Sequence, residues 1–134
     1  MSVAPNIEPE ASGEPSDLDL TLPGRLREFA RSRPGAPALR EKQLGIWQEI
    51  SWREYYDRCA AVARMLWHLG IREGDHISIL SDNRPEWLYA DLGAQGIKAR
   101  SVGIYQTNPP EDVAYILNDS GSKIIFCEDQ EQVD

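Results

Sequence analysis

This sequence has few cysteines, no long apolar run and no recognisable targeting signal. Its 134 residues include two cysteines, Cys59 and Cys127, which are too few for a disulfide framework. Each lies in an apolar pattern, so we expect buried, reduced thiols. No apolar run is long enough to span a membrane, and the N-terminus lacks the basic and apolar regions of a signal peptide. These absences predict a cytoplasmic protein without a membrane span, and they leave peripheral membrane association open.

Motifs that bind phosphate, metals or nucleic acid are also missing. The sequence has no G-x-G-x-x-G, no G-x-S-x-G and no His/Cys cluster at metal-ligand spacing. The stretch SGSK at residues 120–123 leads from a predicted helix into a predicted strand, which is the reverse of a phosphate loop. His68 lies near the end of a predicted helix, where a solvated side chain that complements the helix dipole is the simpler interpretation. Without a basic patch, nucleic acid is not expected as a partner.

The net charge of −8 comes from the two ends of the chain. Residues 1–20 hold five carboxylates and neither Lys nor Arg, and residues 128–134 hold four carboxylates, which leaves +1 between them. Residues 1–19 also contain three prolines and few apolar side chains. Such a segment buries too little surface to offset the entropy of ordering. We therefore expect a disordered acidic tail at 1–19 and an ordered domain over 20–134.

The first part of that domain has the pattern of a helix, a hairpin and a longer helix. Helical spacing starts at Thr21 or Leu22 and ends before Pro34. Short extended runs at 38–41 and 46–50 flank residues 42–45, which favours a hairpin. Residues 51–70 read as the clearest helix, because Ser51 and Glu54 are spaced for a capping box. Gly70 suits the left-handed position after its last turn.

The second part alternates between strands and helices. Compact apolar strands are predicted at 76–80, 100–105 and 123–127, with helices near 84–96 and 109–118. This alternation predicts a parallel βαβαβ unit with right-handed crossovers. The fold class is therefore α/β.

Both strand-to-helix junctions carry the pattern Asn-x-Pro-Glu, at residues 83–86 and 108–111. We interpret Asn83 and Asn108 as helix N-caps, each with a Glu three positions on that completes a capping box. An Asn oxygen and a carboxylate would occupy the positive helix end, so a phosphate site there is disfavoured. Arg84 is the one residue of the first junction that we keep as a possible ligand contact, against the simpler interpretation as a solvated first-turn side chain.

The helix at 84–96 is apolar over most of its circumference. Such a helix is covered on more than one side, and we expect little of this chain to be left to cover it. The sequence also stops where a further helix would begin. Both features lead us to expect a piece of a larger domain.

Four stretches together resemble the N-terminal part of the AMP-forming long-chain fatty-acid–CoA ligases, which belong to the adenylate-forming superfamily. They are LREKQLGIWQEISWREYYDR (39–58), LGIREGDHISILSDNRPEWLYADLGAQ (69–95), SVGIYQTNPPEDVAYILNDSGSKIIF (101–126) and EDQEQVD (128–134). The likeness covers roughly residues 20–134. It departs from the family at Lys98-Ala99, where Gly-Ala is usual. A non-Gly residue in a left-handed turn costs on the order of 1 kcal/mol, so a different turn shape is expected there.

The resemblance implies a fold and a function. Family members stack two α/β sheets with helices between and outside them, which would explain a helix covered on two sides. They use ATP and Mg²⁺ to convert a fatty acid into an acyl-adenylate, from which coenzyme A displaces AMP. The family's catalytic motifs would lie beyond Asp134, so the resemblance carries over no catalytic residue, and this segment alone is expected to be inactive and to hold no cofactor. It implies a place near the CoA tunnel for Tyr105, Gln106 and Thr107, whose alternative interpretation is an ordinary strand-to-helix loop.

Two alternatives to an enzyme segment stay open. One is a free-standing, non-catalytic α/β module that binds a nucleotide or CoA. The other is an interaction protein that pairs with an intact synthetase.

Overall fold

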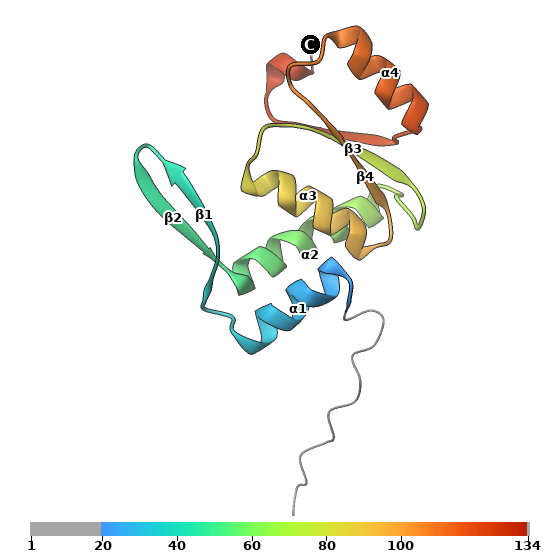
Figure 1. The fold of residues 1–134 in the computed structure, drawn as a ribbon. Coiled ribbons are helices and arrows are strands. Elements are labelled where there is room, and N and C mark those ends of the chain that lie inside the picture. The colour runs from blue at the N-terminus through green and yellow to red at the C-terminus, as the bar shows by residue number, and fades with distance from the viewer. Residues whose placement is uncertain (1–19, 134) are drawn as a thin grey trace, which may run out of the picture.

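The computed structural model describes residues 20–133, so the expected acidic tail at 1–19 lies outside the described residues. The structure contains helices α1–α4, a two-stranded hairpin, a three-stranded parallel sheet and a short 3₁₀ turn (Figure 1). Their bounds are α1 Leu22–Ser32, β1 Pro37–Gln43, β2 Ile46–Ser51, α2 Trp52–His68, β3 His76–Leu80, α3 Pro85–Gly96, β4 Arg100–Ile104, α4 Pro110–Ser120, β5 Ile124–Cys127 and η2 Gln130–Gln132. The predicted elements are therefore confirmed, with boundaries shifted by one or two residues.

The parallel sheet has the strand order β4-β3-β5. The central strand, β3, pairs with β4 and β5 in register, so Ile79 faces Gly103 on one side and Phe126 on the other. The chain moves outward from β3 to β4 and then crosses back to β5. Helices α3 and α4 lie on opposite faces of the sheet (Figure 1). Right-handed crossovers in opposite directions require this arrangement.

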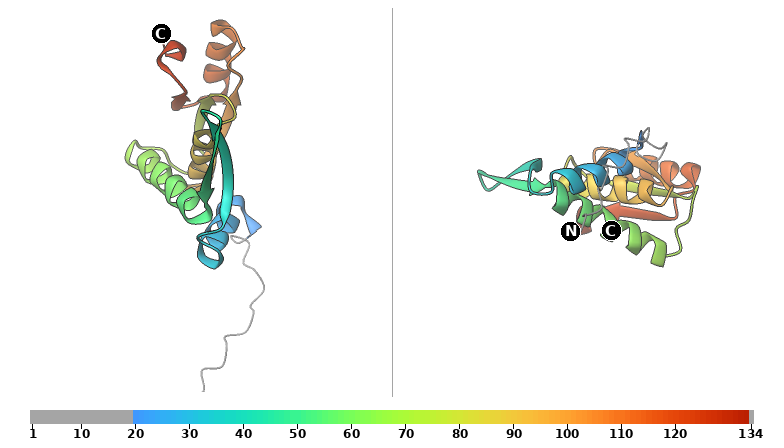
Figure 2. Two further views of the ribbon diagram at one scale, coloured as in Figure 1. Left: turned by 90° about the vertical axis from the view of Figure 1, so that its left-hand side faces the viewer. Right: turned by 90° about the horizontal axis from the view of Figure 1, so that it is seen from below.

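The hairpin of β1 and β2 extends away from the body of the molecule, as the additional views make clear (Figures 1 and 2). Its strands are antiparallel, and Arg40 faces Glu49 across the pair with 2.9 Å between their charged groups. Leu44, Ile46 and Trp47 at its far end are exposed. The far end of the hairpin is thus outside the core, whereas Ala38, Leu39 and Ile50 at its base pack against the core cluster of Leu26, Tyr55, Cys59 and Leu92.

Helix α3 is covered on two sides by this chain itself. Ala90 and Ala94 pack against the sheet core, which includes Ile77 and Ile79. Leu92 belongs to a second core formed with α1 and α2. The expectation that little of the chain is left to cover this helix is therefore wrong. The short α1 and the long α2 supply the cover, because Leu26 of α1 and Tyr55 and Cys59 of α2 form the second core with Leu92.

The close contact between α2 and α3 depends on glycine. A Cβ atom built on Gly93 would lie 2.8 Å from the Cβ of Val62 and 3.0 Å from the carbonyl oxygen of Cys59. Carbon atoms do not approach one another this closely without displacement. Gly93 therefore sets the separation of the two helices.

The start and end of α2 agree with the prediction. Ser51 Oγ accepts a hydrogen bond from the amide of Glu54 at 3.2 Å, and the Glu54 carboxylate accepts one from the amide of Ser51 at 2.8 Å. This pair is a complete capping box. Gly70 has φ +92°, the left-handed conformation expected after the last turn.

The predicted caps of α3 and α4 are wrong. The N-cap residues are Arg84 and Pro109, and neither side chain caps its helix. Each helix begins with proline at its first position, Pro85 or Pro110, because the fixed φ of proline suits that position and its missing N–H is not needed there. Each Asn is thereby moved one residue outside the cap. Glu86 lies too early in α3 to close a capping box and lies 3.7 Å from Arg84 instead.

The turn after α3 keeps the left-handed form without glycine. Lys98 has φ +59°, and the amides of Lys98 and Ala99 donate to the carbonyl oxygens of Gln95 and Ala94. The expectation of a different turn shape is therefore wrong. These hydrogen bonds hold the lysine in a conformation that costs on the order of 1 kcal/mol.

Candidate functional site

The carboxyl ends of the three parallel strands meet at one edge of the sheet. Residues 81–84 follow β3, residues 105–109 follow β4, and Glu128 follows β5. Because α3 and α4 leave the ends of β3 and β4 toward opposite faces, this edge is a topological switch point (Figure 1). Open α/β sheets bind ligands at such points. The edge is therefore the candidate site.

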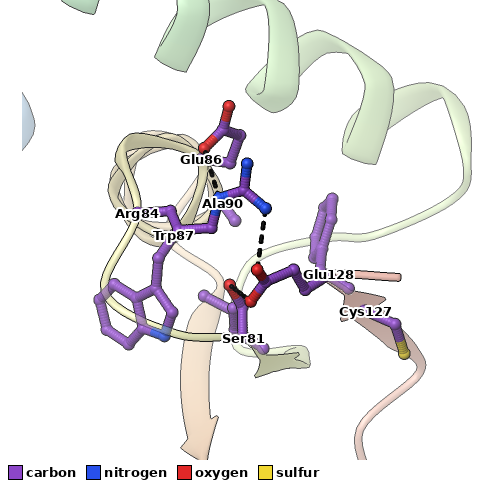
Figure 3. A pocket seen from close by; sticks show the side chains of 9 residues that line it. Ser81, Arg84, Glu86, Trp87, Ala90, Cys127 and Glu128 are labelled. Carbon is purple, nitrogen blue, oxygen red and sulfur yellow. Dashed lines mark hydrogen bonds and ion pairs between the residues drawn. The ribbon is translucent and has the colours of Figure 1, made fainter. Parts of the chain in front are cut away.

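Glu128 connects the loops at this edge. Its carboxylate accepts hydrogen bonds from the Asp82 amide at 2.9 Å, from Arg84 Nη1 at 2.8 Å and from Gln106 Nε2. Ser81 Oγ donates to the same carboxylate at 3.3 Å. Figure 3 shows the Arg84 contact, with the carboxylate directed toward α3. Glu128, which follows β5, thus fixes residues that follow β3 and β4.

The electrostatics of the edge follow from these contacts. The Glu128 side chain is 18% exposed. The hydrogen bond from the Asp82 amide, followed by the contact with Arg84, lowers the pKa of Glu128 below its ordinary value. The carboxylate is ionised at neutral pH, and the arginine balances its charge. The pair leaves neither an uncompensated positive charge for a phosphate nor a free carboxylate for acid–base chemistry.

Two hollows adjoin this network. The first, of about 290 Å³, lies between α3 and β5 and is lined by Ile79, Ser81, Arg84, Glu86, Trp87, Ala90, Phe126, Cys127 and Glu128 (Figure 3). The second, of about 350 Å³, lies over the ends of β3 and β4 and is lined by residues 81–83, Trp87 and residues 103–106. Trp87 lines both hollows. The indole therefore forms a shared apolar wall, beside Arg84, Glu86 and Glu128 in the first hollow and beside Asp82, Asn83 and Gln106 in the second.

The sequence-predicted site residues occupy different places at this edge. Tyr105 lines the second hollow and is 80% exposed. Gln106 also lines that hollow, and its amide donates to Glu128. Thr107 is exposed in the turn before α4. The structure brings Gln106 into the Glu128 network and leaves the Tyr105 ring and the Thr107 hydroxyl to solvent.

Sequence reasoning missed Glu128, the residue that organises the site. It was grouped with the acidic residues of the C-terminal end. The available signal was its position, because it directly follows an apolar strand just as Ser81 follows β3. Arg84, which was kept as a candidate, proves to be its ion-pair partner.

Metal and thiol chemistry are not supplied by the described part of the chain. Residues 20–133 contain no group of three or more His, Cys, Asp or Glu side chains placed to hold a metal ion. Burial raises the pKa of the Cys127 thiol above its ordinary value, which leaves it protonated at neutral pH and weakly nucleophilic. None of the described helices has the length and apolar character needed to cross a membrane.

Comparison with protein families gives a match over most of the chain. The family described as AMP-binding enzyme matches residues 26–134. Among curated relatives, the uncharacterized protein Rv1549 of Mycobacterium tuberculosis is 39% identical over 97 residues, which are 72% of this chain and 54% of that protein. The long-chain-fatty-acid–CoA ligase ACSBG2 of Rattus norvegicus is 31% identical over 121 residues, which are 90% of this chain and 18% of the ligase.

Solved structures give the same fold. A fatty acyl CoA synthetase of M. tuberculosis matches with a TM-score of 0.74 and 26% identity, over 83% of this chain and 22% of that one. The N-terminal domain of FACL13 from the same organism matches with a TM-score of 0.73 and 28% identity, over 78% and 26% of the two chains. This chain therefore spans about half of the relative Rv1549 and about a quarter or less of the synthetases it resembles. The chain belongs to the family of AMP-binding enzymes.

Proposed function

We propose that this chain is part of an enzyme that activates a long-chain fatty acid with ATP and Mg²⁺ and transfers the acyl group to coenzyme A in the cytoplasm. In that reaction the carboxylate attacks the α-phosphorus and pyrophosphate leaves, and the CoA thiol then attacks the acyl carbonyl and AMP leaves. The observation that carries the proposal is the match to a fatty-acid–CoA ligase over 90% of this chain. Residues 20–134 would form the first part of the N-terminal domain.

The part played by these residues is positioning. At the sheet edge, the Glu128 carboxylate is occupied by donors and Arg84 is paired with it. Neither is available to stabilise a developing charge. Chemistry of this kind depends on holding reactants in place, and a rigid edge with fixed loops serves that purpose.

Within this proposal, Tyr105, Gln106 and Thr107 contact the pantetheine arm of CoA. That arm is thin, uncharged and carries amides. The second hollow supports this contact, because the amides of Asn83 and Gln106 lie there with the Trp87 indole, and its one charged lining residue is Asp82. The Gln106 contact with Glu128 holds the loop, while Tyr105 stays exposed to reach a ligand.

The function is tested on the complete protein that carries this segment. It is incubated with palmitate, ATP, Mg²⁺ and CoA, and release of AMP and palmitoyl-CoA is measured. We expect turnover by the complete protein and none by residues 1–134 alone. Absence of both products from the folded complete protein, or turnover by residues 1–134 alone, would contradict the proposal.

The CoA contact is tested in the same enzyme. Tyr105→Ala should raise KM for CoA several-fold and leave ATP–pyrophosphate exchange, which needs no CoA, unchanged. Tyr115→Ala is the matched control, because this exposed tyrosine lies on α4 and lines neither hollow. An equal KM for CoA in both variants would remove Tyr105 from the CoA site.

A non-catalytic module is the second candidate. It is favoured by Rv1549, which is less than twice as long as the segment it shares with this chain. In that case the complete protein would bind CoA or a nucleotide without turnover. Equilibrium dialysis with labelled CoA and ATP separates the two functions.

A further inference from the structure

A further hollow lies among the three helices α1, α2 and α3 and shares no lining residue with the two hollows at the sheet edge. Its volume is about 650 Å³, within the range of small-molecule sites. The lining residues are Thr21, Pro23, Gly24, Leu26, Arg27, Tyr56, Cys59, Ala60, Ala63, Arg64, Leu92, Gln95, Gly96, Lys98 and Ala99. We call it the three-helix groove.

The floor of the three-helix groove is apolar. Leu26, Cys59, Leu92 and Ala99 lie there and are buried. Small side chains, among them Ala63, leave the space above the floor open. Burial raises the pKa of Cys59 to about 12, so this thiol acts as an apolar surface and not as a nucleophile. The floor thus suits an alkyl chain.

The rim of the groove is cationic. Arg27, Arg64 and Lys98 line it and are exposed, and no Asp or Glu among the described residues does. Neither arginine has an ion-pair or hydrogen-bond partner within residues 20–133, and Lys98 makes only a 3.4 Å contact with Glu73. The first turn of α1, which also lines the groove, contains no acidic residue. No carboxylate of that turn therefore offsets its partial positive charge, although the Thr21 hydroxyl accepts a hydrogen bond from the Gly24 amide.

From the apolar floor and the cationic rim, we propose that the three-helix groove binds a single-chain fatty carboxylate, with the alkyl chain over α2 and α3 and the carboxylate between Arg27 and Arg64. Arginine pairs with a carboxylate through two parallel hydrogen bonds. The choice of a carboxylate rests on the proposed function, since a fatty acid is the substrate in that reaction. The groove is separate from the sheet edge and would hold the fatty acid without transforming it.

Binding is measured with the full chain of residues 1–134. The ligand is monomeric dodecanoate at concentrations below micelle formation, followed by calorimetry. Dodecanol tests the need for the charge, butyrate tests the need for the chain, and dodecyl phosphate tests the choice of head group. We expect dodecanoate to bind more tightly than all three.

The variants locate the site. Arg27→Gln with Arg64→Gln should weaken dodecanoate binding about tenfold, the size expected for two partly exposed charge contacts. Ala63→Phe, which fills the groove and leaves the charges in place, should abolish binding. Arg31→Gln with Arg58→Gln is the matched control, because it removes the same charge from α1 and α2 outside the groove and should change the affinity less than twofold.

Several outcomes would overturn the inference. Among the variants, they are equal affinity for dodecanoate in the groove and control variants, or unchanged binding by Ala63→Phe. Among the ligands, they are dodecanol binding as tightly as dodecanoate, or dodecyl phosphate binding more tightly. A preference for vesicles of anionic lipid over monomeric dodecanoate would also overturn it. Thermal unfolding of each variant shows that it is folded. Ligase turnover without dodecanoate binding by the groove would overturn this inference alone, and binding without turnover would overturn the proposed function alone.

Discussion

Arg84 Nη1 lies 2.8 Å from Glu128 Oε1 and joins the residue before α3 to the residue after β5. The same carboxylate accepts from the Asp82 amide. Glu128→Gln should lower the melting temperature and speed hydrogen exchange at the Asp82 amide. Glutamine replaces one carboxylate oxygen by an NH₂ group, which cannot accept the hydrogen bonds that the carboxylate accepts. Glu131→Gln is the control, since Glu131 is exposed. Similar exchange at Asp82 in both variants would show that the network does not hold the loop.

The folded state should lose stability in acid, and protonation of Asp75 should account for part of the loss. The hydrogen bond from Lys123 and then that from the Arg72 amide lower the pKa of Asp75 below its ordinary value of 3.8. As pH falls through that value, Asp75 binds a proton in the unfolded chain before it does so in the folded protein. The stability that the ionised Asp75 contributes to the folded state is therefore lost in acid. Asp75→Asn should melt lower than the wild type at pH 7, and the gap should close below about pH 4. Melting curves from pH 7 to pH 3 measure both, and a gap that persists in acid would contradict the assignment.

Gly93→Ala should destabilise the fold, because the new methyl group would lie 2.8 Å from Val62 Cβ. Overpacking of this kind costs roughly 1–3 kcal/mol. Gly96→Ala is the matched control in the same helix, since its Cβ would have no neighbour within 4 Å. It should be neutral or stabilise by up to about 1 kcal/mol through helix propensity. Urea unfolding distinguishes the two, and equal free energies of unfolding would refute the close packing of α2 on α3.

Ser51→Ala should lower the free energy of unfolding by about 1 kcal/mol, because it removes the capping hydrogen bond at the start of α2. Asn83→Ala should have a much smaller effect, because Asn83 lies outside the cap of α3. Chemical denaturation of the two variants provides the comparison. A larger loss in Asn83→Ala would restore the capping role that its sequence suggests.

The sequence by itself determined the elements and their type. Apolar spacing placed α2 and β3, and Ser51 with Glu54 fixed the start of α2, because helix periodicity and capping act over three or four neighbouring residues. The alternation of strands and helices also determined that the sheet is parallel, since only such a connection leaves room for the intervening helices.

Local sequence preferences did not predict the start of α3, because two of them compete there. In Asn83-Arg84-Pro85-Glu86, the asparagine favours the cap and the proline favours the first helical position. Both preferences cannot be met at this spacing, and proline prevails because its φ is fixed by covalent geometry.

Only the tertiary structure decided the strand order and the contacts that follow from it. Placing β5 beside β3 brings Glu128 to Asp82 and Arg84, which are 46 and 44 positions away in the sequence, and to Gln106, which follows β4. Packing α1 and α2 against α3 covers an apolar helix and forms the three-helix groove. The physical reason is that such contacts depend on how whole helices and strands pack, and no short stretch of sequence carries that information.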